Sequence, residues 1–193
     1  MLAVLDRRLK FWHVCVMVAA ALAWFAGMTL ATQAALPGVG LFRCPIGLCF
    51  GYYAPVELQA TLTRVGKEGR QFLAQTLLPL DTVLPALLAA ALILVIAWFS
   101  RARGVAAVPR GHGARTALVS VPLLYCLADY AENWALAEAL SVFPEIPYRL
   151  ARRASVLTAA KSQLVTAAIG IALALALTAW GRAYQHSRRN TAS

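Results

Sequence analysis

One stretch decides the fold, Leu123-Leu124-Tyr125-Cys126-Leu127-Ala128-Asp129-Tyr130-Ala131-Glu132-Asn133-Trp134-Ala135-Leu136, because it places strongly polar side chains inside an apolar segment long enough to cross a bilayer. On a helix, which turns by about 100° per residue, Asp129, Glu132 and Asn133 lie at positions i, i+3 and i+4 and share one face. Ionisable groups within a membrane span are costly and usually face the interior of a bundle. The patch is therefore either a polar link between packed helices or part of a functional site, and the sequence leaves both interpretations open.

The composition around this stretch indicates an integral membrane protein. Of the 193 residues, 61% are hydrophobic and 13% are charged, which is far too apolar for a soluble domain of this size. The formal net charge of +10 comes from basic residues that lie mostly between the apolar runs. No aromatic residues are interleaved among them to form a nucleic-acid surface, so we do not expect nucleic acid as a partner. The basic residues instead indicate how the chain is oriented in the membrane.

Apolar runs predict an all-α fold, a single membrane domain that forms a four-helix transmembrane bundle with spans at about 12–35, 80–99, 116–141 and 156–180. The first run is longer than the core of a cleavable signal peptide, which is the competing interpretation, so we expect an uncleaved anchor. Residues 36–79 form the predicted outer loop, and residues 181–193 a polar cytoplasmic tail. Within the loop, a helix that starts at Pro55 carries Leu58, Leu62 and Val65 on one face, which predicts an amphipathic helix on the outer membrane surface.

The distribution of basic residues predicts the topology. With four spans, the N-terminus, the second loop and the tail share one side and hold more Lys and Arg than the longer loops opposite. The positive-inside rule therefore places both termini in the cytoplasm, and we expect the membrane to be a bacterial inner membrane. The loop that carries Cys44 and Cys49 then lies in the periplasm or outside the cell.

The fourth span supplies a possible partner for the patch in the third. Thr158, Lys161 and Ser162 again follow the i, i+3, i+4 spacing, and the predicted depth of Lys161 brings its long side chain within reach of Glu132. Asp81, near the outer end of the second span, lies in the same half of the membrane. These positions predict a polar pocket in the outer half of the bundle, made of Asp81, Tyr125, Asp129, Glu132, Asn133, Thr158 and Lys161.

The charges of this pocket do not balance. With all four ionisable groups charged, the pocket would carry a net charge of minus two, which a low dielectric disfavours. A protonated carboxyl, a bound cation or cationic ligand, or an arginine that folds over the mouth could neutralise it. Candidate mouth residues are Glu68, Arg70, Arg152 and Arg153. In the competing interpretation Lys161 extends to the outer interface and Asp81 caps its helix.

Cys44 and Cys49 predict a structural disulfide, because they lie in a loop that faces an oxidising compartment and is able to turn tightly at Pro45 and Gly47. The arrangement is similar to bacterial quinone-linked disulfide-forming proteins, which are also four-span bundles with a cysteine pair in the first outer loop. Those proteins have C-x-x-C there and a second pair in the other outer loop, whereas this chain has C-x4-C and no cysteine in residues 142–153. The histidines are too widely separated to suggest a metal site, and no cofactor is implied.

Local strings also resemble an uncharacterised family of four-span membrane proteins. They are Gly66-Lys67-Glu68-Gly69-Arg70, Asp81-Thr82-Val83-Leu84-Pro85, Ala128-Asp129-Tyr130-Ala131-Glu132-Asn133 and Thr158-Ala159-Ala160-Lys161. The resemblance covers residues 52–161, implies the same four-helix fold and supplies no activity.

The expected function is binding rather than catalysis. We expect a small polytopic membrane protein whose polar pocket holds a ligand, a lipid or a partner subunit, with membrane lipid and a partner membrane subunit or a second copy of the chain as partners. Two alternatives come from other classes. One is a thiol-disulfide or quinone oxidoreductase that uses Cys44 and Cys49, and the other is a cation or proton transport component that uses the carboxylates and Lys161.

Overall fold

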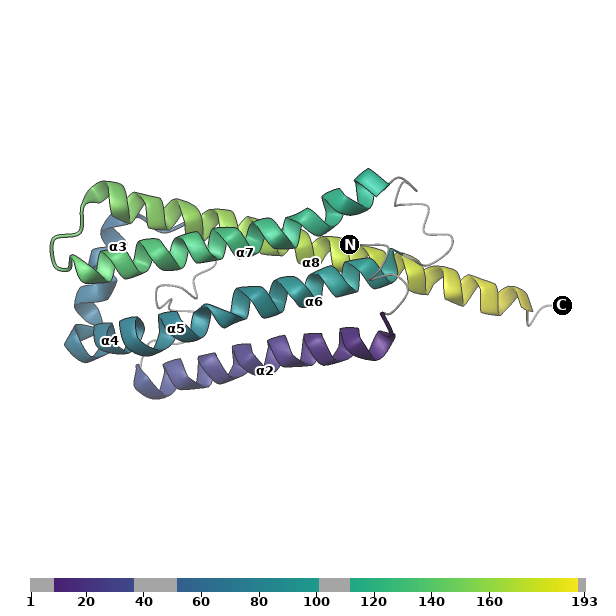
Figure 1. The fold of residues 1–193 in the computed structure, drawn as a ribbon, viewed down its shortest axis with the longest axis horizontal. Coiled ribbons are helices and arrows are strands. Elements are labelled where there is room, and N and C mark those ends of the chain that lie inside the picture. The colour runs from purple at the N-terminus through teal and green to yellow at the C-terminus, as the bar shows by residue number, and fades with distance from the viewer. Residues whose placement is uncertain (1–8, 37–51, 101–111, 191–193) are drawn as a thin grey trace.

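The computed structural model describes residues 9–36, 52–100 and 112–190, and these residues form helices without any strand. The predicted Cys44–Cys49 disulfide lies outside the described residues. In chain order the helices are α2 (Phe11–Ala35), α3 (Pro55–Arg64), α4 (Gly66–Phe72), the π-helical turn η1 (Leu73–Leu77), α5 (Leu78–Asp81), α6 (Val83–Phe99), α7 (His112–Ser141) and α8 (Tyr148–Asn190). Four long helices, α2, α6, α7 and α8, run along the long axis of the molecule, and α3 and α4 lie at one end (Figure 1).

Within the described residues, three helices are long and apolar enough to cross a membrane: Phe11–Ala35, Gly66–Phe99 and Tyr148–Arg182. They expose large apolar side chains, among them Leu22, Leu30 and Leu173, as helices surrounded by lipid do. The fourth long helix, α7, has 30 residues and is long enough to span, but its acidic and amide side chains lower its hydropathy below that of the other three.

The helix that contains the predicted second span begins earlier than expected. Gly66 separates α3 from α4 because its φ of 70° is a conformation that glycine adopts without steric cost. From there α4, η1, α5 and α6 follow one another to Phe99, so most of residues 66–79 are helical rather than loop. Similarly, α8 starts at Tyr148 and continues to Asn190, into the segment predicted as a polar tail.

The junction between α5 and α6 is held by side chains from two other helices. The indole N–H of Trp24 in α2 donates a hydrogen bond to the carbonyl of Leu80 at 3.1 Å. The hydroxyl of Tyr130 in α7 donates to the carbonyl of Thr82 at 3.0 Å. These bonds give partners to backbone acceptors where the helix is interrupted, which an apolar environment requires.

The packing places α6 against α2, α7 and α8, and α7 against α8 (Figure 1). Buried alanines with no exposed surface, Ala135 and Ala139 in α7 and Ala154 in α8, lie in the core at the end near α3. The amphipathic helix predicted after Pro55 is α3, which buries Leu58 and Leu62 in the same core and contacts α8. This end of the molecule contains the candidate site.

Candidate functional site

An ion-pair cluster joins α7 to α8. The ammonium group of Lys161 lies 3.0 Å from Asp129 Oδ1 and 2.5 Å from Glu132 Oε2. The carboxylates are separated by nearly one helical turn, so both reach a single lysine on the facing helix. All three side chains are buried. Lys161 therefore points into the interior, toward the acidic patch of α7, and does not extend to an interface.

Hydroxyl groups of α8 extend the cluster toward the segment before α3. Thr158 Oγ1 donates a hydrogen bond of 2.5 Å to Glu132 Oε1, and Ser155 Oγ donates to the backbone carbonyl of Tyr53. The Tyr53 hydroxyl is buried beside Thr158 and interacts with it. Burial raises the pKa of Tyr53 to about 12. Tyr53 is a member of this cluster that the sequence did not indicate.

Asp81 approaches the cluster from α5. Its carboxyl is buried and interacts electrostatically with Asp129, Lys161 and Asn133. Tyr125, one turn before Asp129 on α7, is also buried and interacts with the Asp129 carboxyl. Lys161 thus faces three carboxyl groups, one from α5 and two from α7.

The predicted pocket residues are therefore close together, but most of them are packed against one another. The side chains of Glu132 and Thr158 have no exposed surface at all. Of the predicted mouth residues, Glu68 is exposed on α4, and Arg152 and Arg153 are exposed on α8. Neither arginine folds over the cluster in an ion pair that the structure records.

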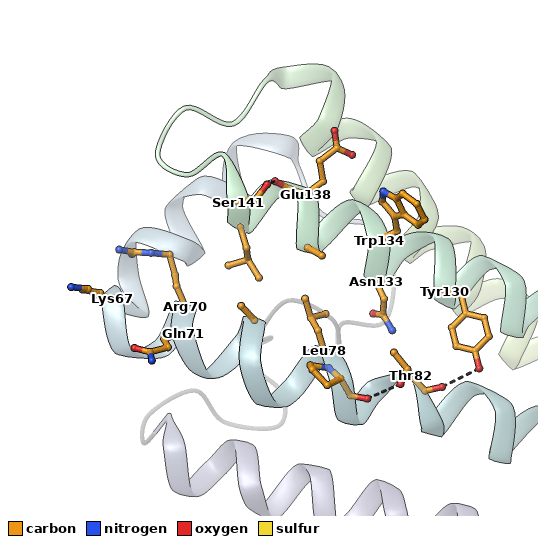
Figure 2. A pocket seen from close by; sticks show the side chains of 14 residues that line it. Lys67, Arg70, Gln71, Leu78, Thr82, Tyr130, Asn133, Trp134, Glu138 and Ser141 are labelled. Carbon is orange, nitrogen blue, oxygen red and sulfur yellow. Dashed lines mark hydrogen bonds between the residues drawn. The ribbon is translucent and has the colours of Figure 1, made fainter.

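Beside the cluster lies a cavity of about 850 Å³ between the segment α4–η1–α5 and helix α7 (Figure 2). This volume falls in the upper part of the range of about 300–1,000 Å³ typical of small-molecule sites. Its wall is mostly apolar. The lining residues are Lys67, Arg70, Gln71, Ala74, Leu78, Pro79, Thr82, Tyr130, Asn133, Trp134, Ala137, Glu138, Leu140 and Ser141.

Asn133 connects the cavity to the cluster. Its side chain lines the cavity and is only 6% exposed. The amide interacts with the Asp81 carboxyl, but neither its carbonyl oxygen nor its amide nitrogen has a hydrogen bond of ordinary geometry within the described residues. Figure 2 shows the carboxamide pointing into the space between α7 and α5. A buried amide without partners costs about 1–3 kcal/mol, so a ligand that supplies them would recover this free energy on binding.

Basic residues lie at the other end of the cavity, on α4. Figure 2 shows Lys67, Arg70 and Gln71 at this end, away from Asn133 and Tyr130. Arg70 is held in place, because Nη1 donates a hydrogen bond of 2.8 Å to the Leu62 carbonyl and its guanidinium lies 4.1 Å from the centre of the Phe143 ring. The acidic residue of the lining, Glu138, is on α7.

Two of the predicted site residues, Asn133 and Arg70, line the cavity. The sequence did not single out Lys67, Gln71, Thr82, Tyr130, Trp134 or Glu138. Helical spacing could have found them, because lining residues recur every three or four positions on both walls. On the α4–α5 side, however, this pattern becomes visible only when the helix is known to begin at Gly66.

Within the described residues, no group of three or more His, Cys, Asp or Glu side chains is arranged to hold a metal ion. No model of a protein family matches the chain, and no curated protein or solved structure is detectably similar to it. The resemblance of the four strings to a four-span family therefore stays a prediction, and the functional assignment rests on the cavity and its surroundings.

Proposed function

We propose that this chain is a polytopic membrane protein that binds a ligand in the cavity between α4–η1–α5 and α7. In this proposal α7 is a fourth span, protected from lipid on its polar face by α8, and the four long helices form a transmembrane bundle. Both termini face the cytoplasm of a bacterial cell, as the basic residues favour. The cavity then opens in the outer half of the inner membrane, close to the surface helix α3.

The observation that carries this proposal is the buried carboxamide of Asn133, which makes no hydrogen bond of ordinary geometry within the described residues and lies at the wall of the cavity. An amide offers both a donor and an acceptor, and the Asn133 side chain lines a cavity with mostly apolar walls. Sites for small molecules combine these features, because apolar surface contributes affinity and a few buried polar groups fix orientation.

The neighbouring ion-pair cluster has a supporting role in this proposal. Lys161 with Asp129 and Glu132 locks α7 against α8 at one register. Because Asn133 directly follows Glu132, this lock also fixes the direction in which its carboxamide points. The buried, closed position of Glu132 favours this positioning role over a site that a solute enters.

Native mass spectrometry of the purified protein tests the proposal. Protein extracted in mild detergent should retain a noncovalent adduct, because the cavity stays filled during purification. Ala137→Trp places an indole in the cavity from an exposed position on α7 and should remove the adduct. Ala174→Trp, at an exposed position of α8 outside the cavity, is the matched control.

A second pair of variants addresses the amide itself. Asn133→Leu keeps the size of the side chain but removes both polar atoms, so it should weaken retention of the adduct at least tenfold. Gln163→Leu makes a similar change on the exposed face of α8 and should have no effect. Equal retention in the wild type and in both cavity variants, Ala137→Trp and Asn133→Leu, would show that the cavity is not the binding site.

A further inference from the structure

The surface of α7 next to the cavity is continuous with it. Leu123, Leu127, Tyr130 and Trp134 follow one another at helical spacing, and all four are exposed, Trp134 by 72%. Tyr130 and Trp134 also line the cavity. In a bundle that spans a bilayer, an exposed apolar stripe of this kind faces lipid, so a molecule in the cavity has a direct path to the surrounding acyl chains.

The polar groups of the lining are divided between two ends. The basic end carries Lys67 and the immobilised Arg70, whose charged groups point away from Asn133 toward the outer edge of the cavity, and the inner end carries the carboxamide of Asn133 (Figure 2). Glu138 contributes a negative charge, which leaves one net positive charge in the lining. The site therefore suits an extended molecule with an anionic group at one end, a hydrogen-bonding group further in and apolar chains beside them.

From this arrangement we infer that the ligand is an anionic glycerophospholipid of the surrounding membrane. Its phosphate lies against Lys67 and Arg70, an ester carbonyl accepts a hydrogen bond from the Asn133 amide, and an acyl chain leaves along Tyr130 and Trp134. This inference deepens the proposed function and rests on it, because it assigns a chemical class to the ligand of the same cavity.

The charge complementarity is local rather than general. Other basic residues at this end of the molecule, such as Arg152 and Arg153, are exposed on α8 and do not line the cavity. A basic side chain beside a bound anionic head group strengthens its binding about fivefold, whereas a basic side chain outside the site contributes little to that binding. Lys67 should therefore affect lipid preference, whereas Arg153 should not.

Titration of the delipidated protein with defined lipids, followed by native mass spectrometry, tests the inference. Phosphatidylglycerol and phosphatidylcholine with identical acyl chains serve as anionic and zwitterionic probes, and glycerol phosphate serves as a head group without chains. Phosphatidylglycerol should bind at least fivefold more tightly than phosphatidylcholine, and glycerol phosphate should not compete with it. Lys67→Ala should reduce the preference about fivefold, and Arg153→Ala should leave it unchanged.

The outcomes separate this inference from the proposed function. If Ala137→Trp abolishes binding of both lipids but the wild type binds them equally, the cavity binds a ligand and the anionic class is wrong. Effective competition by glycerol phosphate would overturn the lipid as ligand in favour of a soluble phosphate compound. Equal effects of Lys67→Ala and Arg153→Ala would also contradict the inference. If Ala137→Trp leaves lipid binding unchanged, the proposed function itself fails.

Discussion

Lys161 links α8 to α7 through two ion pairs. It contacts Asp129 and Glu132 inside a buried environment and is the ammonium that faces all three carboxyls. An intact buried ion pair contributes little net stability. Removing one partner is nevertheless strongly destabilising, because the remaining buried charge has no compensation. The cluster is therefore sensitive to any change that leaves its charges unbalanced.

Lys161→Met should destabilise the protein by about 3–5 kcal/mol, since it leaves the carboxyls without their ammonium. Thermal unfolding in detergent measures this effect, with Arg153→Met at an exposed position of α8 as the control. Glu132→Gln combined with Lys161→Met should be less destabilising than the sum of the single changes, because the two groups contact each other. Strictly additive shifts would mean that these side chains do not interact.

Tyr53→Phe should make the stability of the folded protein less sensitive to alkaline pH. The pKa of Tyr53 in the folded protein, about 12, lies above the usual value near 10. The stability gained from burying the neutral phenol is therefore fully present below about pH 10 and is lost as the pH rises toward 12. Melting temperatures at pH 8 and pH 11 should differ less in Tyr53→Phe than in the wild type, whereas the exposed Tyr52→Phe should behave as the wild type does.

The sequence predicted which polar residues of α7 and α8 lie close together, but it did not predict that their side chains pack against one another and leave no open pocket between them. The i, i+3, i+4 spacing placed these polar residues on one face of α7 and one face of α8, and in the structure Lys161 contacts Glu132 and Asp129. It could not show that these side chains fill the space between the helices, because packing depends on the neighbours of each residue. Asn133 lies at the edge of the patch, and that position leaves its carboxamide facing a cavity.

The segment α4–η1–α5 forms one wall of the cavity. In a regular α-helix, residues spaced by four drift around the axis by about 40° per step. The wider π-helical turn at Leu73–Leu77 offsets part of this drift and helps keep Arg70, Ala74, Leu78 and Thr82 on the cavity wall. Single-turn π-helices frequently occur at functional sites, as this one does in our proposal.

Gly66, at the boundary between α3 and α4, has a left-handed backbone conformation. Gly66→Ala should destabilise the protein by about 1–2 kcal/mol, because a φ of 70° brings the Cβ of an L-residue close to the backbone. Gly170→Ala is the matched control, because that glycine lies inside α8 with open space around it, and the change should be neutral or stabilising. Equal melting temperatures for Gly66→Ala and the wild type would show that the left-handed conformation is not required.

Periodicity predicted the existence of the long helices better than their ends. The early start of the second long helix was not predicted, because two glycines within four residues are typical of a loop. In the structure Gly69 is instead buried inside α4 and packs against Val65 and Leu36. The extension of α8 to Asn190 was not predicted, because the polar tail lacks the apolar periodicity by which helices are recognised in a sequence. Polar residues can nevertheless form a helix, as they do here.

For the whole molecule, the orientation in the membrane can be tested through the cysteines of residues 37–51. In the proposed topology, with both termini in the cytoplasm, Cys44 and Cys49 are expected to face the outside, where a disulfide would be stable. A membrane-impermeant maleimide should label them in cells with a permeabilised outer membrane only after reduction, and Cys44→Ser should make Cys49 reactive without reduction. Absence of labelling in reduced cells, with labelling after lysis, would contradict the topology.

The central claim is that the cavity beside Asn133 binds a ligand, and a high-resolution density map of the wild-type protein tests it most directly. The account predicts elongated density in the cavity, with a polar atom about 2.7–3.2 Å from the Asn133 carboxamide and a tail along Trp134. An empty cavity in protein purified with its native lipids, or an Asn133 carboxamide paired entirely with the protein's own atoms, would contradict the account.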